Sequence, residues 1–178
     1  MTSNNKDERG ILRIALDAYG GISALIKSYY LFASILITII TYNFWMTKEW
    51  WHQVISVTSG ILGFTLGGFA VFLSFGNDKF QRIISGKVTD EEGESPYLEV
   101  SATFLYFISV QVISLIISIV ANATHVELPY NKFTFALYIF GNFIGYWTFI
   151  HGLCLLLAAA LAIFRLSYWF DIFNSKSK

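Results

Sequence analysis

The chain has 178 residues, of which 55% are hydrophobic and 13% are charged, and its formal net charge is zero. Soluble domains carry roughly a quarter of charged residues, so this composition, together with several long apolar runs, indicates an integral membrane protein. A net charge of zero provides no bulk attraction to polyanions, and we expect no direct binding of nucleic acid. The single cysteine excludes a disulfide within the chain and a zinc site built from several thiolates.

Residues 1–27 are predicted to form a cytoplasmic, amphipathic segment. Arg9, Arg13 and Asp17 recur every four residues, which places them on one side of a helix. The opposite side carries apolar residues, namely Ile11, Leu12, Ala15, Leu16 and Tyr19. This pattern favours a helix that lies flat in the membrane interface, and a soluble helix packed on a partner is the alternative.

Residues 28–170 are predicted to form one transmembrane domain, an all-α bundle of four helices. The first two spans cover about residues 28–46 and 54–75, and the short link between them predicts a tight hairpin. The second span is uncharged and reaches about 33 Å as a helix, enough to cross a hydrocarbon core of roughly 30 Å. Aromatic residues near the span ends suit the two membrane interfaces, namely Tyr29, Tyr30, Trp45, Trp50 and Trp51.

The second span carries small residues at steps of four, four, three and four, so they share one face of the helix. They are Ser59, Gly63, Gly67, Ala70 and Ser74. Small residues allow helix backbones to approach closely in lipid, so we expect this face to pack tightly against the same chain or another copy. Asn77 continues the face just below the span.

Residues 76–99 are predicted to form a cytoplasmic loop between the second and third spans. The loop contains a basic pair and an acidic cluster, namely Lys79, Arg82, Asp90, Glu91, Glu92 and Glu94. A solvated loop is one interpretation of these charges. A docking surface for a soluble, cytosolic protein partner is the other.

The third span covers about residues 100–123 and carries Gln111 near its middle. Ser114 and Ser118 lie on the same side of the helix as Gln111. An amide at this depth faces protein or water rather than lipid. An interhelical hydrogen bond and the lining of a pore both remain open for Gln111.

Residues 133–164 carry no formal charge and would extend about 48 Å as one helix, which is too long for an untilted span. We place the fourth span at about residues 146–167 and a cytoplasmic tail at 171–178. Residues 133–145 are then expected to protrude, to tilt or to lie in the outer interface. Small residues share one face here, namely Gly141, Gly145 and Gly152. The simplest pairing sets this face against the small face of the second span.

Basic residues predict the orientation of the chain, because cytoplasmic loops are enriched in lysine and arginine. Ten of the twelve fall on one side of the predicted spans, namely Lys6, Arg9, Arg13, Lys27, Lys79, Arg82, Lys87, Arg165, Lys176 and Lys178. The remaining two, Lys48 and Lys132, fall on the other side. Both termini and the central loop are therefore predicted to be cytoplasmic.

Few residues in this chain can carry chemistry. None of the three histidines stands at metal-ligand spacing from another histidine or a carboxylate, and no catalytic motif occurs. We therefore expect no enzyme, no metal and no cofactor. Asn77, Gln111 and His151 remain as candidates for a pore or a polar network. His151 is interpreted either as a hydrogen-bonded packing residue or as a sensor that titrates near neutral pH.

The second span and the residues after it, GFTLGGFAVFLSFGNDKFQRIISG, resemble the small four-helix membrane proteins of bacterial anti-phage defence systems, such as the membrane subunits of Kiwa systems. The resemblance also rests on size, helix count and predicted cytoplasmic termini. It implies an oligomeric protein of the bacterial inner membrane that acts as sensor or anchor for a cytosolic partner. No family site residue transfers by motif.

A second stretch is similar to bestrophin-type channels, in which an apolar helix ends in serine and phenylalanine. The matching positions are Ser74, Phe75, Asn77, Phe80 and Arg82. This similarity covers about ten residues, and the chain lacks the large cytoplasmic helical part of that fold. A pore-forming effector that depolarises the cell is therefore the alternative function, and a structural accessory subunit of a transporter is a further one.

Overall fold

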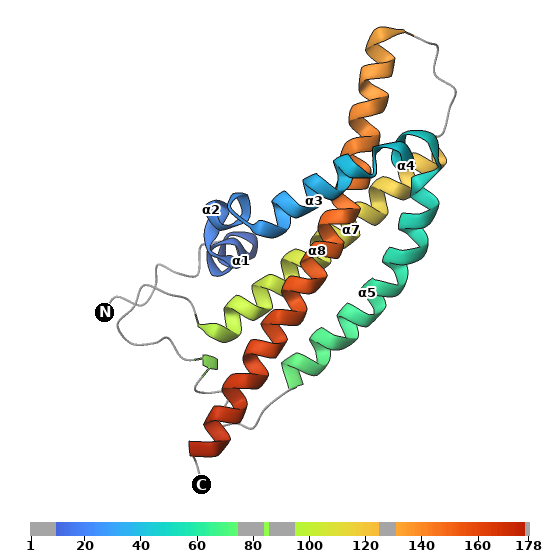
Figure 1. The fold of residues 1–178 in the computed structure, drawn as a ribbon. Helices are drawn as coiled ribbons and strands as arrows, with labels where there is room; N and C mark the ends of the chain where they lie inside the picture. Colours follow the sequence, from blue (N-terminus) through green and yellow to red (C-terminus); the bar gives the residue numbers. More distant parts are fainter. Residues whose placement is uncertain (1–9, 75–83, 86–94, 125–130, 177–178) are drawn as a thin grey trace.

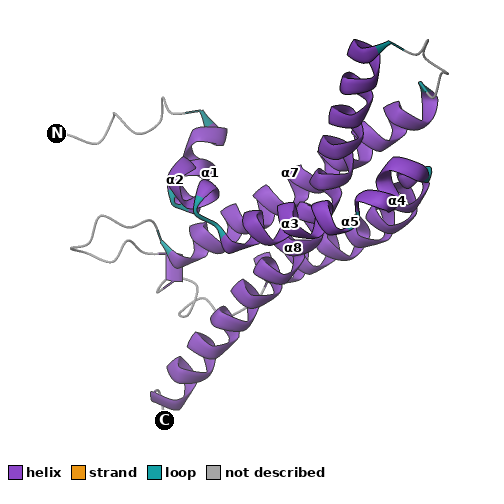
Figure 2. Ribbon diagram, turned by 45° about the horizontal axis from the view of Figure 1, so that its top comes forward, coloured by secondary structure: helices purple, strands orange, loops and turns teal. Residues whose placement is uncertain are grey.

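The computed structural model describes residues 10–74, 84–85, 95–124 and 131–176. All regular structure in these ranges is helical, as Figure 2 shows by colour. The helices in chain order are α1 (Ile11–Tyr19), α2 (Gly21–Ile26), α3 (Tyr29–Ile40), α4 (Tyr42–Thr47), α5 (Trp50–Ser74), α7 (Pro96–Ala123) and α8 (Lys132–Lys176), arranged as in Figure 1.

Three of these helices are long and apolar enough to cross a membrane, namely α5, α7 and α8. They contain 25, 28 and 45 residues. At 1.5 Å per residue, each exceeds a hydrocarbon core of roughly 30 Å. The described chain is therefore an all-helical protein with three candidate membrane spans.

Helix α7 occupies the centre of the bundle, packed against both α5 and α8. Its most deeply buried positions repeat at steps of four and three along the helix. They are Val100, Phe104, Phe107, Gln111, Ser114 and Ser118, each at most 3% exposed. This repeat averages 3.5 residues, the period that keeps one seam of a helix facing its neighbours in a bundle. Large apolar residues fill the seam in the first half of α7, and smaller or polar residues fill it in the second half.

The predicted first span is interrupted in the structure. Helix α3 ends at Ile40, and α4 follows after Thr41. Twelve residues of α3 reach about 18 Å, which is less than the hydrocarbon core. The indole Nε1–H of Trp45 donates to the Thr38 carbonyl oxygen at 2.8 Å, so a side chain satisfies an acceptor near the break. Helices α4 and α5 are separated by two residues, which makes the predicted turn between them tight.

Helix α8 is one continuous helix, so residues 133–145 extend the fourth predicted span without a break. This first part of α8, orange in Figure 1, projects past the ends of α5 and α7. Phe133 and Phe140 in this part are 74% and 63% exposed, whereas Phe143 packs against Trp45. How this segment lies relative to a membrane stays a prediction.

The small face of the second span does not pack within the chain. Its five residues, Ser59, Gly63, Gly67, Ala70 and Ser74, are all exposed. Helix α5 instead contacts α7 through the opposite face, with Val54, Thr58, Thr65 and Phe72 buried. The expected pairing of this face with the glycines of α8 is therefore wrong for the single chain. The physical reason is that α5 turns its opposite face, which carries larger side chains, toward α7.

Two glycines of α8 instead lie against large side chains of α5 and α7. A Cβ atom at Gly145 would lie 2.3 Å from Cη2 of Trp50, and one at Gly152 would lie 2.6 Å from Nε2 of Gln111. No atom of the described residues lies within 4 Å of a Cβ at Gly141, which is exposed. Gly145 and Gly152 thus make room for side chains of α5 and α7, whereas Gly141 contacts none.

Three tryptophans expected at the membrane interface are buried in the protein. Trp45, Trp50 and Trp51 are at most 5% exposed and cluster with Tyr146 and Phe149 at one end of the bundle. Trp50 fits there because Gly145 leaves space for its ring. These three indoles therefore pack within the protein, whereas Tyr29 at the other end is 89% exposed, and an interfacial depth for all four stays a prediction.

Helix α1 lies against α7 of the same chain. Ala18 is 5% exposed, and the ring of Tyr19 lies 5.0 Å from that of Tyr106. Gly20 has a φ of 105°, and Gly21 has a φ of 76°, values that glycine adopts without steric cost. The chain therefore turns at this pair between α1 and α2. An interfacial position for α1 stays a prediction.

Candidate functional site

A buried polar network joins α3, α7 and α8. His151 is 4% exposed, and its Nδ1 lies 3.3 Å from Oγ of Ser34. Its Nε2 lies 2.9 Å from the hydroxyl oxygen of Tyr106. The indole Nε1–H of Trp147 also donates to Ser34 Oγ at 3.0 Å, and the Trp147 ring stacks on the imidazole. Both ring nitrogens of His151 thus have partners within the protein.

The hydrogen bonds of Ser34 indicate the tautomer of His151. The Ser34 hydroxyl donates its single proton to the Leu31 carbonyl oxygen at 2.7 Å. Its oxygen therefore acts as acceptor toward the imidazole, so Nδ1 of His151 carries the proton. Nε2 then accepts from the Tyr106 hydroxyl. This assignment describes a neutral imidazole that bridges two helices, α3 and α7, from its position on α8.

Tyr19 extends the network from α7 to α1. Its ring contacts that of Tyr106 at a tilt of 57°. Burial raises the pKa of the Tyr19 phenol above its ordinary value, and the nearby Tyr30 raises it further. The phenol therefore keeps its proton at neutral pH and remains a hydrogen-bond donor. A displacement of α1 would reach His151 through two adjoining aromatic rings.

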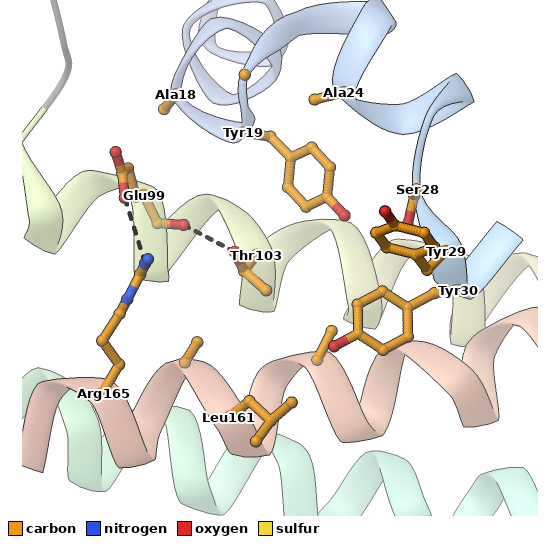
Figure 3. A pocket seen from close by; sticks show the side chains of 13 residues that line it. Ala18, Tyr19, Ala24, Ser28, Tyr29, Tyr30, Glu99, Thr103, Leu161 and Arg165 are labelled. Carbon is orange, nitrogen blue, oxygen red and sulfur yellow. Dashed lines mark hydrogen bonds and ion pairs between the residues drawn. The ribbon is translucent and has the colours of Figure 1, made fainter.

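A pocket of about 530 Å³ lies beside Tyr19, between α1, α2, the start of α3, α7 and α8. Figure 3 shows three tyrosines, Tyr19, Tyr29 and Tyr30, on one side of it. Glu99 and Arg165 lie on the other side, and Thr103 lies between the two groups. The pocket therefore combines aromatic rings, hydroxyl groups and one charge of each sign.

Glu99 and Arg165 form an ion pair across α7 and α8. Nη2 of Arg165 donates to Oε2 of Glu99 at 3.3 Å. The guanidinium also lies over the ring of Trp169, 5.2 Å from its centre. The two side chains are 50% and 42% exposed, so solvent screens the pair and its contribution to stability is small. Both charges stay accessible to a molecule in the pocket.

Gln111 is fully buried, and neither polar atom of its amide has a hydrogen-bond partner among the described residues. Thr58 and Ser114 also hold a buried hydroxyl without a partner in this part of the chain. Of the two interpretations of Gln111, an interhelical hydrogen bond therefore has no partner among the described residues. Pore lining is not supported within the protomer either, because the side chain is enclosed between α7 and Gly152 of α8.

Gln111→Met should raise the free energy of unfolding by about 1–3 kcal/mol, because burying an amide without partners costs about that much. Methionine has a similar length and keeps the contact with Gly152. Thermal unfolding in detergent micelles measures the change, with Ser118→Ala as a control that alters a different seam position of α7. A lower unfolding temperature for Gln111→Met would show that the amide has a stabilising partner.

Several predicted site residues lie outside the described residues, namely Asn77, Lys79, Arg82, Asp90, Glu91, Glu92 and Glu94. The structure therefore neither supports nor opposes a role for them. Among the described residues, it brings Gln111 next to Gly152 and places His151 in a separate network with Ser34. No group of histidine, cysteine and carboxylate side chains in the described ranges could hold a metal ion.

The sequence reasoning missed Ser34, Tyr106 and the Glu99–Arg165 pair. A signal for Ser34 exists, because Ser34 and Thr38 stand four apart in an apolar helix and are both fully buried. A signal for the pair also exists, since an acid at the start of one predicted span and a base at the end of the next fall at the same membrane face. The partner of each residue, however, is distant in sequence.

Comparisons with known proteins add no family to these observations. The chain matches no protein-family model, and searches of curated proteins and of solved structures find no match.

Proposed function

We propose that this chain is an oligomeric protein of the bacterial inner membrane that serves as sensor or anchor of an anti-phage defence complex with a cytosolic partner. Support for the defence role comes from the resemblance of residues 63–86 to the membrane subunits of such systems. Support for assembly comes from the exposed small face of α5. Support for sensing comes from the polar network that links α1 to the core of the bundle.

The proposed topology has four membrane segments with both termini in the cytoplasm. Helices α3 and α4 together make the first segment, and α5, α7 and α8 make the others. The α4–α5 junction and the start of α8, which carry Lys48 and Lys132, lie toward one end of the bundle in Figure 1. The start of α7 and the last part of α8, which carries Arg165, lie toward the other. The positive-inside rule then assigns the end with Arg165 to the cytoplasm.

The groove on α5 is the observation that carries self-association. It has a volume of about 460 Å³ and is lined by Ser59, Gly60, Gly63, Phe64, Gly67 and Gly68. A Cβ atom added at any of its four glycines would meet no described atom within 4 Å, and Phe64 at its rim is 88% exposed. Lipid tails fill such a groove poorly. A helix of a second copy can instead approach the backbone of α5 closely and place its own Phe64 in the groove.

Affinity purification of the tagged full chain from a bacterial host in mild detergent tests the function. We expect a soluble protein to co-purify in fixed ratio. Neutralising the acidic cluster, by Asp90→Asn, Glu91→Gln, Glu92→Gln and Glu94→Gln together, should remove this partner and abolish protection against phage. Glu49→Gln, between α4 and α5, is the matched control and should change neither.

Two results would contradict the proposal. The first is full retention of the partner and of protection after neutralisation, which would reject the docking surface. The second is depolarisation of the cell membrane by the chain expressed alone, with no co-purifying protein, which would favour the pore-forming effector. A membrane-potential dye read in the same cultures separates the two functions.

A further inference from the structure

The pocket in Figure 3 opens where a membrane-embedded bundle would meet lipid head groups. It lies at the end of α7 and α8 that carries Glu99 and Arg165, which the proposed topology places at the cytoplasmic face. Its volume of about 530 Å³ falls within the range of ligand pockets, about 300–1,000 Å³. One wall is Leu161 of α8, which is 52% exposed and adjoins the exposed Leu157. The pocket is therefore continuous with a surface that suits acyl chains.

The charged side of the pocket is itself a fixed pair of opposite charges. Arg165 uses one N–H group toward Glu99, and a guanidinium has five, so donors remain for a phosphate group. The Glu99 carboxylate beside it can receive an ammonium group. Because the pair is neutral overall, a purely anionic head group would gain the attraction of Arg165 but suffer the repulsion of Glu99. A head group with both charges gains from both residues.

The aromatic side of the pocket supplies hydroxyl donors at interfacial depth. Figure 3 shows the hydroxyl group of Tyr30 directed toward Leu161 and that of Tyr19 directed toward Tyr29 and Tyr30, on the side of the pocket away from Arg165. Tyrosine suits the membrane interface because its ring is apolar and its hydroxyl is polar. These hydroxyls can donate to the ester oxygens of a glycerol backbone. The pocket thus has a charged part for a head group, a polar part for the glycerol and an apolar wall for the chains.

We propose that this pocket binds the phosphate–ammonium head group of a zwitterionic phospholipid, with the phosphate on Arg165 and the ammonium on Glu99. Occupancy of the pocket would hold α1 against the bundle, since Tyr19 contacts both the pocket and Tyr106. This inference depends on the membrane-embedded topology but not on the defence role. Loss of a cytosolic partner would therefore leave it intact.

Native mass spectrometry of the full chain, released from nanodiscs of mixed lipid, tests the proposal. The nanodiscs contain equal amounts of phosphatidylethanolamine and phosphatidylglycerol, and the lipid that stays bound is counted. We expect the wild-type chain to retain phosphatidylethanolamine in preference. Arg165→Gln should lower this retention about tenfold, a usual effect of losing a charge-assisted hydrogen bond. Glu99→Gln should shift the preference to phosphatidylglycerol, because Arg165 is then an unbalanced positive charge.

Matched variants separate the pocket from general charge effects. Lys132→Gln removes an exposed positive charge at the other end of the bundle and should leave retention unchanged. The double variant Glu99→Arg/Arg165→Glu keeps an ion pair and should regain the preference for phosphatidylethanolamine. Far-UV circular dichroism and membrane fractionation confirm that each variant folds and inserts.

Three results would overturn the proposal. Equal or greater retention of phosphatidylglycerol by the wild-type chain would reject a zwitterionic head group. An unchanged preference in folded Glu99→Gln would reject the carboxylate as the ammonium site. Displacement of the retained lipid by millimolar glycerophosphoethanolamine, which has no acyl chains, would assign the pocket to a soluble ligand instead of a lipid.

Discussion

Gly145→Ala should lower the free energy of unfolding by roughly 1–3 kcal/mol, a large effect for the addition of one methyl group. The new Cβ atom would lie 2.3 Å from Cη2 and 2.7 Å from Cζ2 of Trp50. The indole cannot move away easily, because Trp50 is 1% exposed and donates to Oδ1 of Asn142 at 2.7 Å. Moving the ring would break this hydrogen bond and leave buried polar groups unpaired.

Gly141→Ala, one helical turn earlier, is the matched control for this substitution. The position is exposed, and no atom lies within 4 Å of its Cβ. Alanine should raise stability there by up to about 1 kcal/mol through its higher helix propensity. Thermal unfolding of both variants in detergent micelles should therefore show shifts of opposite sign. Equal shifts would mean that Trp50 does not pack on Gly145.

Gly152 provides a graded comparison along the same helix. A Cβ at Gly152 would meet the far end of the flexible Gln111 side chain, whose amide has no hydrogen bond to lose among the described residues. Gly152→Ala should therefore cost less than Gly145→Ala. The two variants should lose different amounts of unfolding free energy because the new methyl group meets a rigid indole at position 145 and a flexible amide at position 152.

The second large effect concerns assembly. Gly63→Leu and Gly67→Leu, made together, should prevent the proposed self-association while leaving the fold of the protomer intact. Both positions are exposed, and a Cβ at either would meet no atom of the described residues within 4 Å. Two leucines would fill the groove that a second helix needs for close backbone approach. We expect self-association to weaken by at least about a hundredfold, equivalent to two contacts of roughly 1–2 kcal/mol.

Mass photometry or native mass spectrometry in mild detergent measures this change in copy number. Leu157→Phe adds bulk at an exposed position of α8, away from the groove, and should leave self-association unchanged. Phe64→Ala removes a side chain from the rim and should weaken assembly without adding a clash. A wild-type chain that is monomeric in both detergent and nanodiscs, or a leucine variant that stays oligomeric, would contradict the assembly proposed for this face.

Composition and the long uncharged runs were sufficient to predict the class of this protein. Few charges and runs of about 20 or more apolar residues leave an all-helical membrane protein as the main solution, because helices satisfy their own backbone hydrogen bonds in lipid. The three long helices, α5, α7 and α8, lie close to the places that this argument predicts. The number of membrane segments and the orientation stay predictions, since both concern a bilayer rather than the chain itself.

Helix periodicity predicted which residues share a face, but it did not predict what that face meets. The small residues of α5 do lie on one side, yet that side points outward, because the seam of α7 contacts the opposite side of α5. The glycines of α8 also divide between two situations, since Gly145 receives Trp50 and Gly141 receives nothing. Which faces meet depends on the order of helices across the bundle, and that order is a property of the whole chain.

Tertiary structure alone decided the partners of the polar residues. His151 meets Ser34 across 117 positions of sequence, and Glu99 meets Arg165 across 66. Near the break at Thr41, the Trp45 indole likewise donates to the Thr38 carbonyl oxygen, seven residues earlier. The sequence by itself therefore determined the helices and the faces they present, because those follow from periods of three and four residues. The network and the pocket exist only once distant helices pack side by side, because their hydrogen bonds and charges must meet within about 3 Å.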